Sequence, residues 1–251
     1  MQDTGKTQKA CWALALALGM ASAQAQVVAS GGLAELSLEQ LSDLPVTSVS
    51  GRPESLRSAP ASVFVISEED IRRSAATSLP EALRLAPNLQ VARTSAGQYA
   101  ISARGFNNAI ANKLLVLIDG RTIYSPLFSG VFWEAQDLLL DDIERIEVLG
   151  GASGTLYGSN AVNGVINIIT RSASETTDPL LKLGAGDAER VTAARIGGAS
   201  PDGLHWRLYA KRYLADRSPG PPGSEPDALR RSLAGFRADR ALDRDHLTLQ
   251  G

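Results

Sequence analysis

The chain has 251 residues, of which 44% are hydrophobic and 21% charged, and its formal net charge is −2. This composition is ordinary for a folded protein of one or two domains. It contains no dense run of basic residues and only 5% aromatic residues, so it excludes an electrostatic or base-stacking interaction with nucleic acid.

Residues 1–25 form a separate segment that we predict to be a cleaved signal peptide. Lys6 and Lys9 precede an almost unbroken apolar run, Ala10–Ala23. The run is shorter than the roughly 20 residues that a membrane-spanning helix needs. It ends in Ala23-Gln24-Ala25, the small-x-small pattern that a signal peptidase cleaves. We therefore expect export, with the mature chain beginning at Gln26.

The mature part lacks two features that would widen its chemistry. The single cysteine, Cys11, lies inside the predicted signal peptide, so neither disulfides nor thiolate metal sites are available afterwards. No later apolar run is long enough for a transmembrane helix. Any membrane crossing by the mature chain would therefore have to use strands.

Residues 26–58 are predicted to be a lead-in that cannot build a core of its own. A short leucine-rich helix would end at Pro45, and the β-prone stretch Pro45–Ser50 follows it. The alternative interpretation of this lead-in is a mobile linker.

Residues 59–172 alternate short strands with short helices, which predicts a compact α+β domain with a small mixed sheet. Ser62–Ile66 is an expected strand, and Ser67 with Asp70 would cap the helix that follows. Ser78 with Glu81 predicts a second capping box. Further strands are expected at residues 89–92, 99–103, 113–118, 121–124, 143–149 and 162–170, with a hairpin turn at residues 119–120.

Residues 173–251 are predicted to form five strands separated by turn residues. Along Leu204–Leu214, apolar side chains alternate with His205, Arg207, Tyr209 and Lys211. One apolar and one polar face suits either a soluble sheet or a strand of a lipid-facing barrel.

No motif predicts catalysis. The glycine-rich stretch Gly150–Gly158 lacks the Gly-Lys-Ser/Thr ending of a phosphate loop and is expected to lead directly into a strand. Its glycines are better explained by positive φ angles and close backbone approach. His205 and His246 have no ligand-spaced partner. The acidic residues between Asp137 and Glu147 fit a solvated helix end followed by structural ion pairs better than a general-acid pair. We expect no enzyme activity and no cofactor.

Three motifs together carry a resemblance to a known family. They are ISARGF at Ile101–Phe106, LLVLIDGRTIY at Leu114–Tyr124, and DIERIEVLGGASGTLYGSNAVNGVINIIT at Asp142–Thr170. In order and spacing, residues 44–172 resemble the plug domain of TonB-dependent outer-membrane receptors. One departure is that Gly150 and Ala152 stand where the family usually has Arg and Pro, which puts a plug-to-barrel contact in doubt.

The resemblance implies an α+β plug (residues 59–172) followed by the first antiparallel strands of an incomplete outer-membrane β-barrel (residues 173–251). Such receptors carry large scarce nutrients, such as iron–siderophore complexes or cobalamin, across the outer membrane. The plug gates the barrel and the protein TonB supplies the energy. The expected partners are therefore TonB, a metal chelate or corrinoid ligand, and the outer membrane. A non-transporting fragment or a soluble periplasmic plug-like interaction module is the alternative, because five strands are too few for a barrel.

The resemblance also implies roles for three groups of residues. The TonB-interacting segment would comprise Pro45, Val46, Thr47, Ser48 and Val49, which can add as a strand to a partner's sheet edge. Outward plug loops would offer Asn107, Asn108, Tyr124, Phe128 and Trp133 to the ligand, although Trp133 could equally belong to the plug core. Structural ion pairs would involve Arg104, Glu144, Arg145 and Glu147. No metal site is expected.

Overall fold

The computed structural model describes residues 45–48, 54–55, 62–110, 112–127, 129–216, 227–242 and 245–251. The chain divides into two units, residues 1–31 and 32–251, and everything described belongs to the second. The predicted signal peptide, most of the lead-in, Val49 and Phe128 lie outside the described residues. In the described ranges, no helix has the length and apolar character needed to cross a membrane.

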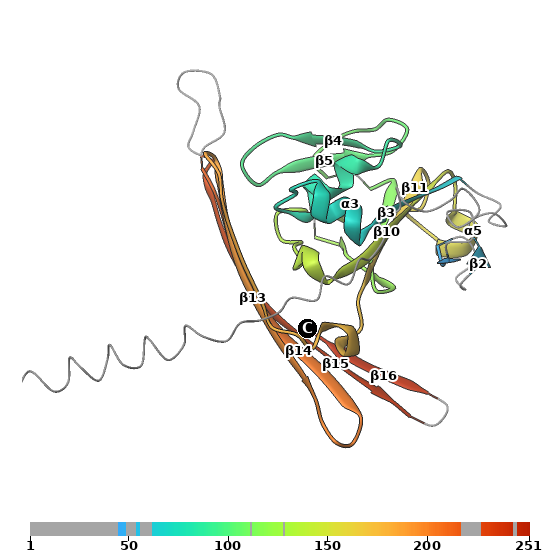
Figure 1. Cartoon of the computed structure of the whole chain (residues 1–251). Coiled ribbons are helices and arrows are strands. Elements are labelled where there is room, and N and C mark those ends of the chain that lie inside the picture. The colour runs from blue at the N-terminus through green and yellow to red at the C-terminus, as the bar shows by residue number, and fades with distance from the viewer. Residues whose placement is uncertain are drawn as a thin grey trace, which may run out of the picture. The chain divides into compact units, whose positions relative to one another are not determined.

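A five-stranded mixed sheet organises the first half of the described chain (Figure 1). Its strand order is β3-β10-β11-β6-β7, and β11 and β6 form its parallel pair. The strands are β3 (Ser62–Ser67), β10 (Ile143–Gly150), β11 (Gly164–Thr170), β6 (Leu114–Ile118) and β7 (Arg121–Thr122). All five residues of β6 are buried, which confirms that this apolar run is a strand covered on both faces.

The main hydrophobic core lies on one face of this sheet. Ile66, Val116, Ile146 and Ile166 project into it from four neighbouring strands. The elements that cover this face are α3 (Glu68–Arg73), α4 (Leu79–Ala82), the 3₁₀-helix η2 (Leu83–Leu85), and the hairpin of β4 (Gln90–Arg93) and β5 (Tyr99–Ser102). Each fully buried aliphatic side chain contributes about 1.5–3 kcal/mol, so this layer accounts for much of the domain's stability.

The two predicted capping boxes behave differently. Ser67 caps α3 as predicted, because its hydroxyl accepts from Asp70 N (3.1 Å) and Asp70 Oδ2 accepts from Ser67 N (3.0 Å). The box at Ser78 is wrong, since the Ser78 side chain makes no capping bond to α4. Glu81 instead accepts a hydrogen bond from the Tyr99 hydroxyl (2.7 Å). A tertiary contact with β5 has replaced the local one.

Two predicted turns have the backbone geometry that their residues favour. Asp119 (φ 48°) and Gly120 (φ 77°) both have positive φ angles, as a type I′ hairpin turn between β6 and β7 requires. In the glycine-rich stretch, Gly151 has φ 119°, a conformation that L side chains rarely adopt. A short helix, α5 (Gly154–Tyr157), lies within this stretch, and the next element after the stretch is the strand β11, as the sequence predicted.

Short elements complete this half of the chain. They are β1 (Pro45–Val46), β2 (Glu54–Ser55), β8 (Tyr124–Ser125), β9 (Gly130–Val131), and the 3₁₀-helices η3 (Leu140–Asp142) and η4 (Ala173–Thr176). β1 pairs with β2, and β8 pairs with β9, both antiparallel.

A second sheet of five long antiparallel strands follows (Figure 1). Its strands are β12 (Leu180–Ala185), β13 (Glu189–Ala199), β14 (Leu204–Ala215), β15 (Leu229–Ala241) and β16 (His246–Gln250), paired in sequence order. In β14 the predicted alternation is present, but its polarity is inverted relative to a soluble sheet. Arg207 and Lys211 are buried, whereas Leu208 is 49% exposed.

Candidate functional site

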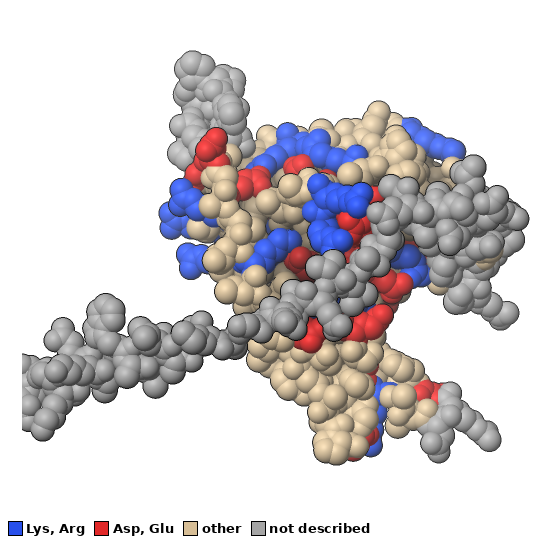
Figure 2. Space-filling view, viewed as in Figure 1, with Lys and Arg blue, Asp and Glu red and all other residues tan. Residues whose placement is uncertain are grey.

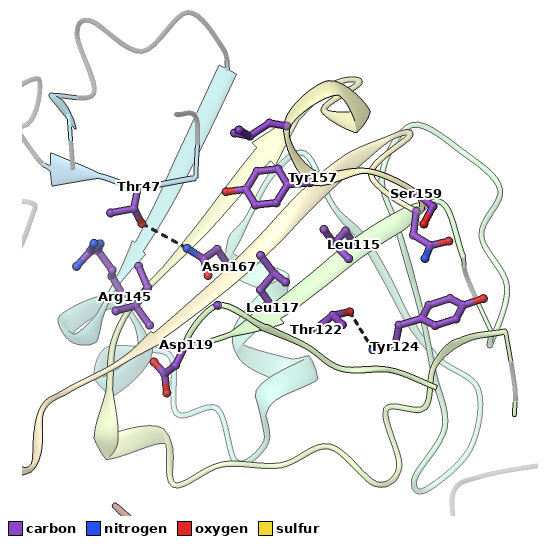
Figure 3. A pocket seen from close by; sticks show the side chains of 14 residues that line it. Thr47, Leu115, Leu117, Asp119, Thr122, Tyr124, Arg145, Tyr157, Ser159 and Asn167 are labelled. Atoms are coloured by element: carbon purple, nitrogen blue, oxygen red, sulfur yellow. Dashed lines mark hydrogen bonds between the residues drawn. The ribbon is translucent and has the colours of Figure 1, made fainter. Parts of the chain in front are cut away.

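The described part of the lead-in lies against the face of the mixed sheet opposite the main core. Backbone N–H groups of Thr47 and Ser48 both donate to the Glu147 carboxylate, at 3.0 and 2.8 Å. The Ser48 hydroxyl also donates to Glu147 through a short contact, and Asn167 Nδ2 donates to Thr47 Oγ1 at 3.4 Å. The Thr47–Asn167 bond is visible in Figure 3. Backbone and side-chain hydrogen bonds, including one from the Thr47 hydroxyl to Glu147, therefore fasten a segment in which Val46 and Ser48 are fully buried.

Glu147 is fully buried, with 0% of its surface exposed, in the centre of β10. Its register neighbours are Val65 on β3 and Asn167 on β11. A buried carboxylate requires hydrogen bonds and an opposite charge, and Arg145 Nε provides the charge at 2.9 Å. The remaining acceptor capacity of Glu147 is filled by the lead-in, so the carboxylate and the segment satisfy each other.

A cavity of about 780 Å³ adjoins this contact. Leu115 and Leu117 of β6 lie at its centre, with Thr47 and Arg145 on one side and Tyr124 on the other (Figure 3). The cavity wall also includes Tyr157. Burial, together with the nearby negative charge of Glu147, raises the pKa of the Tyr157 hydroxyl.

A second cluster of buried charges joins the mixed-sheet half to the long strands. Asp137 receives Lys211 Nζ of β14 at 2.9 Å and Arg231 Nη2 of β15 at 2.7 Å. Lys211 also donates to the carbonyl oxygens of Thr77 and Leu138, both at 3.1 Å. All three hydrogens of this ammonium group thus have acceptors, which offsets the cost of burying it.

Asp142 also pairs with cations of the long strands. It pairs with Arg195 of β13 through a short contact, and Arg207 Nε of β14 lies 3.3 Å from its other oxygen without hydrogen-bond geometry. Arg207 Nη1 instead donates to the carbonyl of Arg171 at 2.6 Å. The buried face of the strands is thus basic where it meets carboxylates of the first half. The sequence pattern predicted that these acidic residues form a solvated helix end followed by structural ion pairs. The prediction of solvation is wrong for Asp137 and Asp142, because both are buried.

The opposite face of the long strands is apolar and exposed. Its large exposed side chains are Leu181, Leu183, Ile196, Leu208, Phe236, Leu247 and Leu249. In Figure 2, the part of the strands that extends below the mixed-sheet half carries mainly uncharged side chains in this view, whereas Lys, Arg, Asp and Glu gather above it. A sheet that buries charge and exposes leucine has the polarity of a strand between lipid and a polar interior.

The residues predicted to contact a ligand differ in their exposure to solvent. Asn107 and Asn108 are exposed, Tyr124 is half-buried and lines the cavity beside Thr122, and Trp133 is only 4% exposed. Trp133 belongs to the main core, which is the alternative that the sequence left open. Tyr124 lies on the same cavity as Thr47, a relationship that residue types alone did not indicate.

The end of the ISARGF motif has unusual backbone geometry, which the sequence did not predict. Arg104, Gly105 and Phe106 all have positive φ angles, of 56°, 96° and 58°. Such conformations are costly for non-glycine residues and often mark functional loops. Phe106 is 72% exposed, and Arg104 makes no ion pair within the described part of the chain.

Of the four residues proposed for structural ion pairs, Arg145 is bonded to both Glu144 and Glu147.

The residues of these sites form hydrogen bonds and ion pairs, and their arrangement does not suggest catalysis. Among the described residues, no three His, Cys, Asp or Glu side chains are grouped as metal ligands.

Comparisons with known proteins agree with this geometry. Residues 55–165 match the family model of the TonB-dependent receptor plug domain. The vitamin B12 transporter BtuB of Vibrio vulnificus is 35% identical over 154 residues, covering 60% of this chain and 24% of that protein. The iron-regulated outer membrane virulence protein of Vibrio cholerae is 40% identical over 177 residues, covering 68% of this chain and 25% of that protein.

Among solved structures, the pyoverdine outer membrane receptor FpvA of Pseudomonas aeruginosa superposes with a TM-score of 0.65. The match covers 84% of this chain and 30% of that one at 19% identity, so it concerns the fold. It extends over both the mixed sheet with its short helices and the five-stranded antiparallel sheet that follows. The chain spans about a quarter of the length of the curated relatives it matches.

Proposed function

Because this chain carries the plug domain of a TonB-dependent receptor, we propose that it serves an outer-membrane transporter for a large scarce nutrient, either an iron–siderophore complex or cobalamin. In this proposal residues 59–172 gate a barrel that begins with β12–β16. Transport by binding and conformational change requires no catalytic set, which agrees with a site made of hydrogen bonds and ion pairs.

The observation that carries the proposal is the inverted polarity of the second sheet. Its exposed leucines would face lipid, and its buried cations Lys211, Arg207 and Arg195 meet carboxylates of the plug. Exposing this much apolar surface to water would be unfavourable at about 25 cal/mol per Å². A membrane environment removes that cost and leaves the charged face in the polar interior of the barrel.

We further infer that Pro45–Val49 is the segment that the energy-coupling protein TonB engages. The short β1 strand already pairs through its backbone with β2, and strand addition to a partner's sheet uses the same type of bond. The segment lies on the plug face opposite the main core, where it is bonded to β10 and β11. A pull on it would therefore act directly on the central sheet of the plug.

Ligand contact is proposed for Asn107, Asn108 and Tyr124, with Phe128 lying outside the described residues. The strained, exposed Phe106 extends this group, because it adjoins Asn107 and presents an aromatic face to solvent. An aromatic surface of this kind suits a bulky chelate or a corrinoid better than a small ion.

Fractionation of cells expressing the full-length gene product tests the proposal. We expect a heat-modifiable outer-membrane protein that confers uptake of labelled cobalamin or of one ferric chelate from a panel. Recovery as a soluble periplasmic protein, with no uptake of any compound, would instead support the alternative of a non-transporting plug-like interaction module.

A further inference from the structure

One carboxylate, that of Glu147, accepts the backbone N–H groups of two successive residues of the lead-in. The bonds from Thr47 N and Ser48 N measure 3.0 and 2.8 Å, and the hydroxyls of the same two residues also point to this carboxylate. Bonds to an ionised acceptor are about twice as strong as neutral ones. Glu147 is therefore the main polar attachment of this segment to the plug.

The dependence between Glu147 and the segment is mutual. Without Thr47 and Ser48, the fully buried carboxylate would keep Arg145 as its partner but lose its backbone donors. An under-satisfied buried charge is costly. The adjoining cavity touches Thr47 and Arg145, so water could reach this position once the segment leaves.

The same N–H groups are needed for strand addition to a partner. A strand joins a sheet edge through its main-chain hydrogen bonds, and a donor already bonded to Glu147 is not available for that purpose. We propose that Glu147 is a latch: a positioning residue that holds residues 45–48 on the plug and limits their access to a strand-adding partner. This inference rests on the proposed function, since it assumes that the segment has such a partner.

The rate at which a cysteine in this segment is labelled reports how firmly the segment is held, and it can be measured without transport. Val46 is fully buried, so Val46→Cys in the full-length protein should react slowly with a polar maleimide. Glu147→Gln keeps the shape but removes the charge, and its NH₂ group must replace one carboxylate oxygen, which places it against the donors of either the lead-in or Arg145. We expect labelling to become about tenfold faster, the effect of losing bonds to a charged group.

Glu144→Gln is the matched control. Glu144 lies on the same strand and pairs with the same Arg145, yet it is half exposed and accepts no hydrogen bond from the lead-in among the described residues. Labelling of Val46→Cys should remain at the parental rate in this variant. Equal acceleration by both substitutions would mean general loosening of the plug and would overturn the latch.

A second variant covers the case in which Glu147→Gln does not fold. Ser48→Ala removes the Ser48 hydroxyl donor and leaves Glu147 intact, so a smaller acceleration is expected. Because the two residues act through one contact, the double variant should label no faster than Glu147→Gln alone. Unchanged labelling in both single variants, with the heat-modifiable barrel intact, would overturn the inference.

The outcomes separate this inference from the proposed function. TonB-dependent uptake combined with unchanged labelling in Glu147→Gln would leave the transporter in place and remove the latch. Faster labelling in a protein that takes up no nutrient would remove the transporter function. In a functional receptor, Glu147→Gln should also bind the periplasmic domain of TonB more tightly in the absence of nutrient.

Discussion

Lys211 on β14 donates to Asp137 across a distance of 2.9 Å, and their side chains are only 3% and 2% exposed. The two residues are 74 positions apart in the sequence. Through this pair, the first long strands hold the plug by a contact that water cannot readily screen. Arg231 adds a second cation to the same carboxylate at 2.7 Å.

Replacing Lys211 with Met should loosen the plug. The substitution leaves Asp137 buried with Arg231 as its remaining cation, and breaking one side of a buried pair costs about 3–5 kcal/mol. We expect faster proteolysis of the plug in isolated outer membranes. Arg240→Met is the control, because Arg240 forms an exposed pair with Asp202 at 3.6 Å and such pairs contribute about 0–1 kcal/mol. Equal protease resistance of the two variants would contradict this role for Lys211.

Two truncations should have different effects: Trp133→Ala should lower stability, and Tyr124→Ala should weaken nutrient binding. Trp133 is buried in the main core, so its truncation should lower the free energy of unfolding by about 3–5 kcal/mol. Tyr124 is half-buried beside an open cavity, and its truncation should weaken nutrient binding with little effect on stability. Thermal unfolding and ligand titration of the full-length receptor measure the two effects. Unchanged nutrient affinity in Tyr124→Ala would remove Tyr124 from the ligand site.

Gly164→Ala should destabilise the plug because no space exists for a side chain. A Cβ at this position would lie 2.3 Å from the carbonyl oxygen of Leu149 on the paired strand. The two strands would have to separate locally, at a cost above about 1 kcal/mol. Gly154→Ala, which would meet no atom within 4 Å, is the matched control. A Gly164→Ala protein as stable as Gly154→Ala in a denaturant titration would refute the close approach of β10 and β11.

The stability of the plug should depend on Tyr99 at alkaline pH. Burial raises the pKa of the Tyr99 hydroxyl, and its hydrogen bond to Glu81 raises it further. A pKa raised in the folded state favours the neutral hydroxyl, so its contribution is full below the ordinary value of about 10 and is lost as pH rises through the folded pKa. The stability difference between the parent and Tyr99→Phe should therefore shrink as the pH rises above about 10. A constant difference would show that the hydroxyl is not held in its neutral form.

Local patterns predicted most of the elements but not the tertiary contacts. Alternation along β14 and the unbroken apolar run of β6 specify strands, and Ser67 with Asp70 specifies a helix start, because each signal lies within a few residues. Ser78 with Glu81 failed for a physical reason: Glu81 is bonded to Tyr99, a residue 18 positions away. Local propensity does not encode such competition.

The residue types of the candidate site could be predicted from the sequence, but the contacts between those residues could not. The β-prone character of residues 45–50 and the charges at Arg145 and Glu147 could be read from the sequence, but their bond spans 99–100 positions. Similarly, the acidic residues near Asp137 have no local partner, and their cations come from strands that follow much later. Residue type predicted ion pairs, whereas the fold determines which ones form.

Nutrient uptake measured with and without TonB tests the central claim most directly. Cells expressing the full-length protein should accumulate labelled cobalamin or a ferric chelate, and deleting TonB should abolish that accumulation. Replacing residues 45–49 with a Gly-Ser sequence should have the same effect while leaving the protein in the outer membrane with its nutrient affinity intact. Uptake that persists without TonB, or with residues 45–49 replaced, would contradict the account.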